Sequence, residues 1–166
     1  MVFMLIVGWS YNLGLKATGF SVIPYALGFG LLPLFVTSTF DYPQLPPWWV
    51  VLASSLLGVS AHFANALPDL LEDRKTGVNS LPHIVGQRAS ALTIATAATV
   101  ASIIVVTHSP GLDLGLAVSG FVLTVGLSIF SSALALRSEP PRVMFYLLLV
   151  ASFVNVFLLV LGQLTQ

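Results

Sequence analysis

The 166-residue sequence contains no cysteine and very few charged residues. The absence of cysteine excludes disulfides, thiolate nucleophiles and Cys-ligated zinc or iron–sulfur sites. Charged residues make up only 7% of the chain, against about 25% in a soluble domain, whereas 57% of the residues are hydrophobic. The six basic and six acidic residues cancel to a formal net charge of zero, which gives no reason to expect nucleic acid as a partner. With so few charges to face water, most of the chain must have lipid as its solvent.

Long apolar runs account for most of the sequence. A helix needs roughly 20 mostly apolar residues to cross a bilayer, and a helix satisfies its own backbone groups, as lipid demands. Several runs reach this length, whereas the apolar residues 1–10 amount to only half a span. The predicted full spans are 20–37, 48–67, 89–108, 112–136 and 143–163. We therefore predict an all-α, polytopic transmembrane helical bundle that forms a single membrane domain over residues 1–166.

The basic residues fall on alternate connections between the predicted helices. They lie in the first, third and fifth polar connections, at Lys16, Arg74, Lys75, Arg88, Arg137 and Arg142. The second and fourth connections carry Asp41 and Asp113 and no Lys or Arg. The positive-inside rule places the basic connections in the cytoplasm, which predicts a multi-pass protein of the cell membrane. We interpret Arg88, Arg137 and Arg142 as anchors of this topology.

The segment 60–88 concentrates the polar chemistry of the chain. It holds three of the six acids and three of the six bases. Asn65, Asp69 and Asp73 recur at a spacing of four, which places them on one face of a helix, about one turn apart. Pro68 predicts a local bend, because it removes one backbone hydrogen bond.

Carboxylates are costly at the end of a membrane helix. An Asp at the centre of such a helix costs about 2.5–3.5 kcal/mol, and the helix dipole disfavours negative charge at a C-terminus. Asp69, Glu72 and Asp73 therefore need a compensating cation, of which Arg74 and Lys75 supply part. Mg²⁺ would supply more, because it takes oxygen ligands and often combines one or two carboxylates with substrate phosphate. The alternative is a solvated, salt-bridged helix end.

Other polar residues flank this segment. Tyr11 and Lys16 lie just past the half span, and Lys16 is a point charge that can pair with phosphate or simply anchor the topology. His62 lies three residues before Asn65, near the same helix face. His83 lies in a cytoplasmic connection, where it can touch an anionic ligand.

Two stretches resemble a known family. The run NALPDLLEDRKTGVNSLP resembles the second aspartate-rich motif of the UbiA superfamily of intramembrane prenyltransferases, and YNLGLKATGFSVIPYALGFGLLP is similar to its Tyr-x-x-x-x-Lys segment and following helix. The resemblance implies Mg²⁺-dependent transfer of a prenyl group from a prenyl diphosphate to a lipophilic acceptor, preferably aromatic, within the membrane. It implies that Asp69 and Asp73 bind the metal and that Tyr11 and Lys16 are catalytic. The substrate-binding residues expected on this basis are Asn65, Lys16, Arg74 and Lys75.

The resemblance also implies how much of the family's fold these residues represent. The family has nine transmembrane helices and a first motif of the Asn-Asp-x-x-Asp type, which does not occur in this sequence. Counted backwards, residues 1–10 match the end of helix four, and the five full spans match helices five to nine. We therefore expect the C-terminal half of such an enzyme, with a missing N-terminal half as its partner and an incomplete reaction in this fragment.

Two other functions fit parts of the pattern. A CDP-alcohol phosphotransferase also uses an Asp-x-x-x-Asp motif at a helix end, but the Asp-Gly-x-x-Ala-Arg string that it needs upstream does not occur here. A non-catalytic membrane bundle or a transporter with an ion-binding carboxylate face remains open, because acids within membrane proteins often mark ion pathways.

Overall fold

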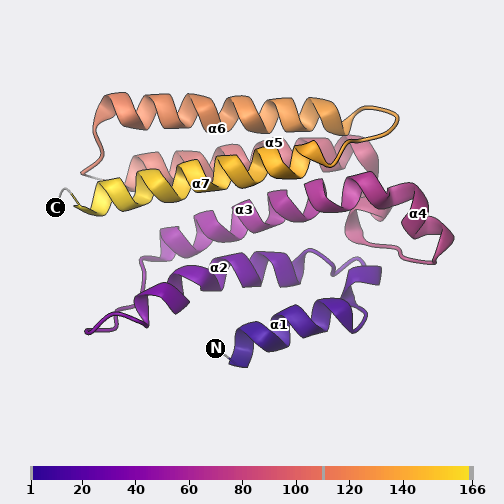
Figure 1. Cartoon of the computed structure of the whole chain (residues 1–166), viewed down its shortest axis with the longest axis horizontal. Helices are drawn as coiled ribbons and strands as arrows, with labels where there is room; N and C mark the ends of the chain where they lie inside the picture. Colours follow the sequence, from indigo (N-terminus) through magenta and orange to yellow (C-terminus); the bar gives the residue numbers. More distant parts are fainter. Residues whose placement is uncertain (1, 110, 165–166) are drawn as a thin grey trace.

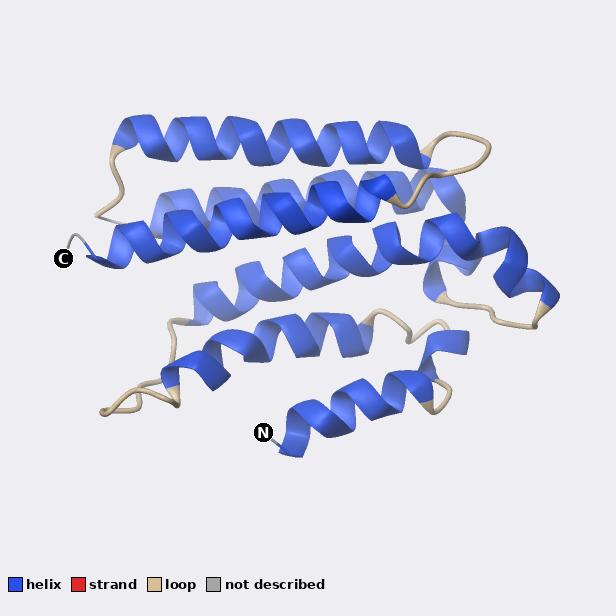
Figure 2. Cartoon of the chain, viewed as in Figure 1, coloured by secondary structure: helices blue, strands red, loops and turns tan. Residues whose placement is uncertain are grey.

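The fold is built from helices, as a computed structural model of the chain shows (Figure 1). The structure describes residues 2–109 and 111–164, apart from the side chains at positions 3, 4, 71, 74, 163 and 164. Within these residues it has helices and no strands (Figure 2). The elements are α1 (Val2–Asn12), η1 (Leu15–Ala17), α2 (Ile23–Thr37), α3 (Trp48–Ala66), η2 (Leu67–Asp69), α4 (Leu70–Lys75), α5 (Leu81–His108), α6 (Leu114–Ala135) and α7 (Val143–Leu164), where η denotes a 3-10 helix. The prediction of an all-α polytopic bundle is confirmed.

The long helices lie side by side and alternate in direction (Figure 1). The helical stretches that are long and apolar enough to cross a bilayer are Trp48–Asp69, Leu81–His108, Leu114–Ala135 and Val143–Gly162. The remaining predicted span is shorter, because α2 has only 15 residues. These helices make the chain a multi-pass membrane protein.

Two helix starts differ from the sequence prediction by three residues or more. α2 begins at Ile23 rather than at residue 20, because Ser21 sits in a turn and uses its side chain for tertiary hydrogen bonds. α5 begins at Leu81 rather than at residue 89, so the predicted polar connection is largely helical. The helical geometry of α5 is interrupted at Gly86, whose φ of 82° is a left-handed conformation that glycine adopts without strain.

Small side chains let the helices pack closely. α2 packs on α3, α3 on α5, α5 on α6 and α6 on α7. The buried core includes Ala53, Ala64, Ala91, Ala98, Ala101 and Ala135. At the α2–α3 contact, a Cβ added to Gly58 would lie 2.5 Å from the Tyr25 carbonyl oxygen. This close approach is typical of membrane helices, which associate through small residues.

The connections after α1, around α4 and between α6 and α7 lie at one end of the bundle (Figure 1). They hold all the basic residues except Arg88, which lies in the second turn of α5 next to the same end. We call this the basic end. The acidic turn, residues 69–73, also lies there, where α3 gives way to η2 and α4.

Candidate functional site

The acidic turn continues α3 at the basic end. Pro68 lies at the start of the 3-10 turn η2, as expected for a residue that cannot donate to the preceding helix turn. Asp69 ends this turn, and Asp73 lies in α4 one turn later. The backbone carbonyl of Asp73 accepts hydrogen bonds from the amides of Thr76 and Val78, at 3.1 and 3.0 Å, which ends α4. At Pro68, where the sequence predicts a bend, the helix changes from α to 3-10 geometry.

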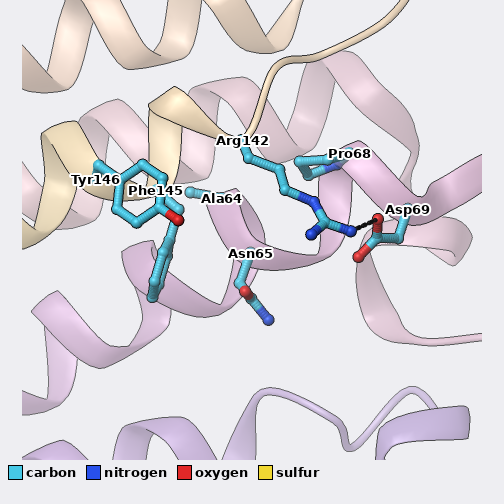
Figure 3. A pocket seen from close by; sticks show the side chains of 7 residues that line it. All are labelled: Ala64, Asn65, Pro68, Asp69, Arg142, Phe145 and Tyr146. Carbon is cyan, nitrogen blue, oxygen red and sulfur yellow. Dashed lines mark hydrogen bonds and ion pairs between the residues drawn. The ribbon is translucent and has the colours of Figure 1, made fainter.

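A small cavity of about 220 Å³ lies beside Asp69. It is lined by Ala64, Asn65, Pro68, Asp69, Arg142, Phe145 and Tyr146 (Figure 3). Arg142 reaches into it from the start of α7, and its Nη2 atom lies 3.2 Å from Oδ1 of Asp69. The two side chains are 76% and 41% exposed, so the pair is accessible to water and ions. Asn65 and Asp69 thus share one cavity, and the cation that faces them comes from a distant part of the sequence.

Two phenols, Tyr25 and Tyr11, lie in ring contact next to Asn65. The Nδ2 atom of Asn65 donates to the hydroxyl of Tyr25 at 3.1 Å, and the Tyr25 ring meets the Tyr11 ring edge-on, with centroids 5.4 Å apart. Burial, and to a smaller extent the nearby Tyr25 and the charge of Asp73, together raise the pKa of the Tyr11 phenol to about 12. Tyr11 is therefore a neutral phenol within the electrostatic field of Asp73.

A buried histidine, His62, packs against the Tyr25 ring. His62 is fully buried, its Nε2 atom lies 3.0 Å from the Ser21 hydroxyl, and its ring lies against Tyr25 with centroids 4.9 Å apart. The Ser21 oxygen also accepts the backbone N–H of Leu81 at 2.9 Å. The Ser21 hydroxyl and the His62 Nε2 atom therefore share one hydrogen bond, and the Ser21 oxygen has a second lone pair that accepts the Leu81 N–H. One side-chain oxygen thus joins the starts of α2 and α5 to α3.

His83 holds the segment that carries Asp73. The His83 ring nitrogen Nδ1 lies 2.7 Å from the Ser80 hydroxyl, and Nε2 lies 3.2 Å from the Leu70 carbonyl and 4.0 Å from Oδ2 of Asp73. Because the carbonyl can only accept, Nε2 carries the proton and Nδ1 accepts from Ser80. The His83 side chain is almost completely buried, so it contributes a fixed donor next to a partly exposed carboxylate.

The remaining predicted site residues lie at the basic end without forming a closed site. Lys16 lies in η1 and is exposed, and Lys75 is the exposed last residue of α4. The side chain of Arg74 lies outside the described residues. Neither lysine forms an ion pair with a described residue.

The oxygen chemistry of the acidic turn suits Mg²⁺. The described residues contain no group of three His, Asp or Glu side chains that could hold a metal ion by themselves. Mg²⁺ does not need such a cage, because it keeps several waters and is commonly bound by one or two carboxylates together with substrate phosphates. The partly exposed carboxylates of Asp69 and Asp73 fit that mode of binding, in which the substrate completes the coordination.

A second, larger cavity of about 700 Å³ is apolar. It lies between α2, α3 and α7 and reaches toward the opposite end, at Pro46 and Pro47. Its walls include Phe29, Leu57 and Phe153. A volume of this size is typical of small-molecule sites, and this one suits a hydrocarbon chain.

The sequence analysis did not single out Tyr25, and it placed His62 and Arg142 without assigning them partners. Tyr25 is 40 residues from its partner Asn65, and His62 is 41 residues from Ser21. Arg142 pairs with Asp69 across 73 residues. We interpreted Arg142 as a topology anchor, and it also lines the cavity beside Asp69. The only available signal was that each is a polar side chain near the basic end of a membrane helix, where such residues are often functional.

Comparison with known proteins gives one family. The sequence profile of the UbiA prenyltransferase family matches residues 1–157. No curated protein and no solved structure matches the chain.

Proposed function

Since the chain belongs to the UbiA prenyltransferase family, we propose that it acts in the Mg²⁺-dependent transfer of a prenyl group from a prenyl diphosphate to a lipophilic acceptor, preferably an aromatic one. Membership supports a membrane prenyltransferase in general. The observation that carries the finer proposal is the connection of Asp69, through Asn65 and Tyr25, to Tyr11 at the basic end. A carboxylate site for the diphosphate and a pair of aromatic rings are thereby joined.

In this proposal the acidic turn would supply the carboxylates for a metal ion beside the diphosphate. Asp69 and Asp73 would hold Mg²⁺, which neutralises negative charge on the diphosphate as it leaves. Lys16, Arg74 and Lys75 would bind the phosphate oxygens as additional cations. Asn65 would line the cavity beside Asp69, and its amide would orient the Tyr25 ring through their hydrogen bond.

The two phenols would face the carbon that reacts. The bond between C1 of the prenyl chain and the diphosphate oxygen breaks, and its electron pair leaves with the diphosphate. C1 then bonds to the acceptor, which loses a proton. The faces of Tyr11 and Tyr25 can stabilise the positive charge that develops on the prenyl group through cation–π attraction. Because the pKa of Tyr11 is raised to about 12, this phenol stays protonated and is a poor competitor for the prenyl cation.

The apolar cavity between α2, α3 and α7 would hold a hydrocarbon tail. Its apolar walls exclude water, which would otherwise capture the cation. We propose that the protein lies in the cell membrane with the basic end in the cytoplasm, as the positive-inside rule predicts. The diphosphate group of the substrate would then meet the acidic turn at the cytoplasmic surface, and its prenyl tail would stay in the bilayer.

Binding of a radiolabelled prenyl diphosphate to the chain in lipid nanodiscs tests this function, with Mg²⁺ or with EDTA. We expect binding that requires Mg²⁺, and we expect Asp69→Asn and Asp73→Asn to lose the Mg²⁺-dependent part. Asp41→Asn is the matched control, because Asp41 lies in the exposed connection between α2 and α3 at the opposite end. Normal binding by both acidic-turn variants would show that the metal assignment is wrong, and Mg²⁺-independent binding by the unmodified chain would contradict the function.

Transfer is measured separately with lipophilic acceptors extracted from membranes. The proposed reaction predicts a labelled product that partitions into organic solvent, together with released inorganic diphosphate. Lys16→Ala should weaken the apparent affinity for the prenyl diphosphate more than that for the acceptor, and an unchanged affinity for the diphosphate would remove Lys16 from the site.

A further inference from the structure

Two side-chain contacts, from His83 and from Arg142, end on the acidic turn, and only that of Arg142 joins a permanent cation to a carboxylate. His83 approaches Asp73 only to 4.0 Å and is held by the Leu70 carbonyl. Arg142 makes a single contact of 3.2 Å to one oxygen of Asp69, and its side chain is 76% exposed. An exposed pair of this kind contributes only about 0.2–1 kcal/mol, because water and salt screen it. Arg142 is therefore attached to Asp69 weakly enough to be displaced.

The position of Arg142 in its own helix is electrostatically unfavourable. Arg142 directly precedes α7, and the first turn of α7 contains no acidic residue. A helix N-terminus carries partial positive charge, so it favours anions over a guanidinium. The backbone at this point is fixed, since the amide of Phe145 donates to the Arg142 carbonyl at 3.1 Å. The anion that offsets this conflict comes from another helix, as the Asp69 carboxylate.

We propose that Arg142 occupies Asp69 in place of a divalent cation and transfers to the diphosphate when such a cation binds. The inference rests on the proposed function and adds to it a residue that exchanges partners. A divalent cation at Asp69 competes directly with the guanidinium for the same oxygen. Once released, the Arg142 side chain keeps its fixed backbone origin beside the cavity and offers its planar set of N–H donors to phosphate oxygens.

The exchange has a physical benefit in each state. Without a cation, Arg142 keeps Asp69 from being an uncompensated charge at the end of a membrane helix. With the cation and the diphosphate present, the added negative charge of the phosphates compensates Arg142 at the start of α7. The site therefore stays close to electrically balanced before and after the substrate binds.

Mn²⁺ binding to the purified 166-residue chain in detergent, followed by the electron paramagnetic resonance signal of free Mn²⁺, tests the competition. Arg142→Gln should bind Mn²⁺ about two- to fivefold more tightly than the unmodified chain, the factor that corresponds to an exposed ion pair. Arg137→Gln is the matched control, because it removes the same charge from the same connection and Arg137 forms no ion pair with a described residue. It should change Mn²⁺ affinity less than Arg142→Gln does.

Binding of inorganic pyrophosphate in the presence of Mn²⁺ tests the transfer. Arg142→Gln should weaken it, and Arg142→Lys should restore the Mn²⁺ affinity of the unmodified chain but only part of the pyrophosphate affinity, because lysine lacks the planar set of donors. Unchanged or weaker Mn²⁺ binding by Arg142→Gln, or unchanged pyrophosphate binding, would overturn the exchange. Asp69→Asn separates the two proposals. If it fails to reduce Mn²⁺ binding, the metal site itself is wrong and the exchange falls with it; if it reduces Mn²⁺ binding while Arg142→Gln has no effect, only the exchange is wrong.

Discussion

The amide of Asn65 donates to the hydroxyl of Tyr25 at 3.1 Å, which links α3 to α2 one turn before Asp69. Neither side chain is fully buried, yet each has a defined partner on the neighbouring helix. The bond sets the tilt of an aromatic ring relative to the carboxylate site. It is therefore a place where a change without any effect on charge should affect the reaction.

We expect Asn65→Leu and Tyr25→Phe each to reduce prenyl transfer, because either change removes the bond that orients the Tyr25 ring. The loss of one hydrogen bond should also lower the free energy of unfolding by about 0.5–1.5 kcal/mol. Transfer rates and denaturant titrations in detergent measure the two effects. Asn12→Leu is the control, because this exposed amide bonds only to its own helix, at Gly8. If Asn65→Leu behaved like Asn12→Leu, the bond would have no role in positioning Tyr25.

We expect the small substitution Ser21→Ala to lower the stability of the folded chain strongly. Ser21→Ala leaves the His62 Nε2 atom and the Leu81 N–H without their partner in a buried place. Each unsatisfied group costs about 1–3 kcal/mol, so the midpoint of thermal unfolding in detergent should fall clearly. Ser38→Ala provides the comparison, because the Ser38 hydroxyl is exposed and bonds within its own turn. Equal midpoints for the two variants would mean that Ser21 does not join the three helices.

The raised pKa of Tyr11 gives a pH dependence with a definite sign. Below pH 10.0, the ordinary pKa of a tyrosine, the folded and unfolded states both keep this proton and stability does not change on its account. As the pH rises from 10.0 toward about 12, the unfolded chain loses the proton while the folded chain keeps it, so the folded state loses stability. The difference in phenolate absorbance between the unmodified chain and Tyr11→Phe reports this ionisation.

The same titration measures the closeness of Tyr11 to the acidic turn. The charge of Asp73 is one of the causes that raise the pKa of Tyr11, after burial and the neighbouring Tyr25. Asp73→Asn should therefore lower the pKa of Tyr11, whereas Asp41→Asn at the opposite end should leave it unchanged. A Tyr11 titration that did not respond to Asp73→Asn would place the two side chains further apart than the structure does.

Asn155 and Thr124 lie far from the acidic turn, and we expect their contact to stabilise the bundle without affecting substrate binding. The buried amide of Asn155 donates to the Thr124 hydroxyl at 3.2 Å, which joins α7 to α6. Such bonds between membrane helices average about 0.6 kcal/mol and reach about 1.7. Thr124→Val should lower the unfolding free energy by an amount in this range and leave Mg²⁺-dependent binding of prenyl diphosphate intact. Thr93→Val is its control, because the Thr93 hydroxyl is exposed and bonds to its own helix at Ala89.

The parts of the fold that could be predicted from the sequence depend on local patterns. The order of the long helices, their alternation of direction and the basic end followed from apolar run lengths and the positions of a few charges, because lipid restricts a chain to a small set of structures. The short helix α4 did not. The neighbourhood of Asn65 and Asp69 followed from their spacing of four. Helix starts were less accurate, since Ser21 and Gly86 act through tertiary bonds and backbone conformation that no periodicity reveals.

The partners of the acidic turn could not be predicted, for a physical reason. Arg142 reaches Asp69, and Tyr25 and His62 meet next to Asn65, because of the way in which the helices pack side by side. Hydropathy does not specify which helix faces meet. An isolated arginine beside a membrane helix carries the same signal whether it anchors topology or binds a carboxylate. Only the packed arrangement distinguishes Arg142 from Arg137 on the same connection.

The contact at Gly58 restricts the site although the residue never meets a substrate. One turn separates it from His62, and Tyr25 lies directly across the helix crossing, where a methyl group on residue 58 would collide with the Tyr25 carbonyl. Separation of the two helices by even the width of that methyl would withdraw the phenol from both His62 and Asn65 together. The spacing of this crossing therefore fixes the position of Tyr25 relative to both of its neighbours on α3.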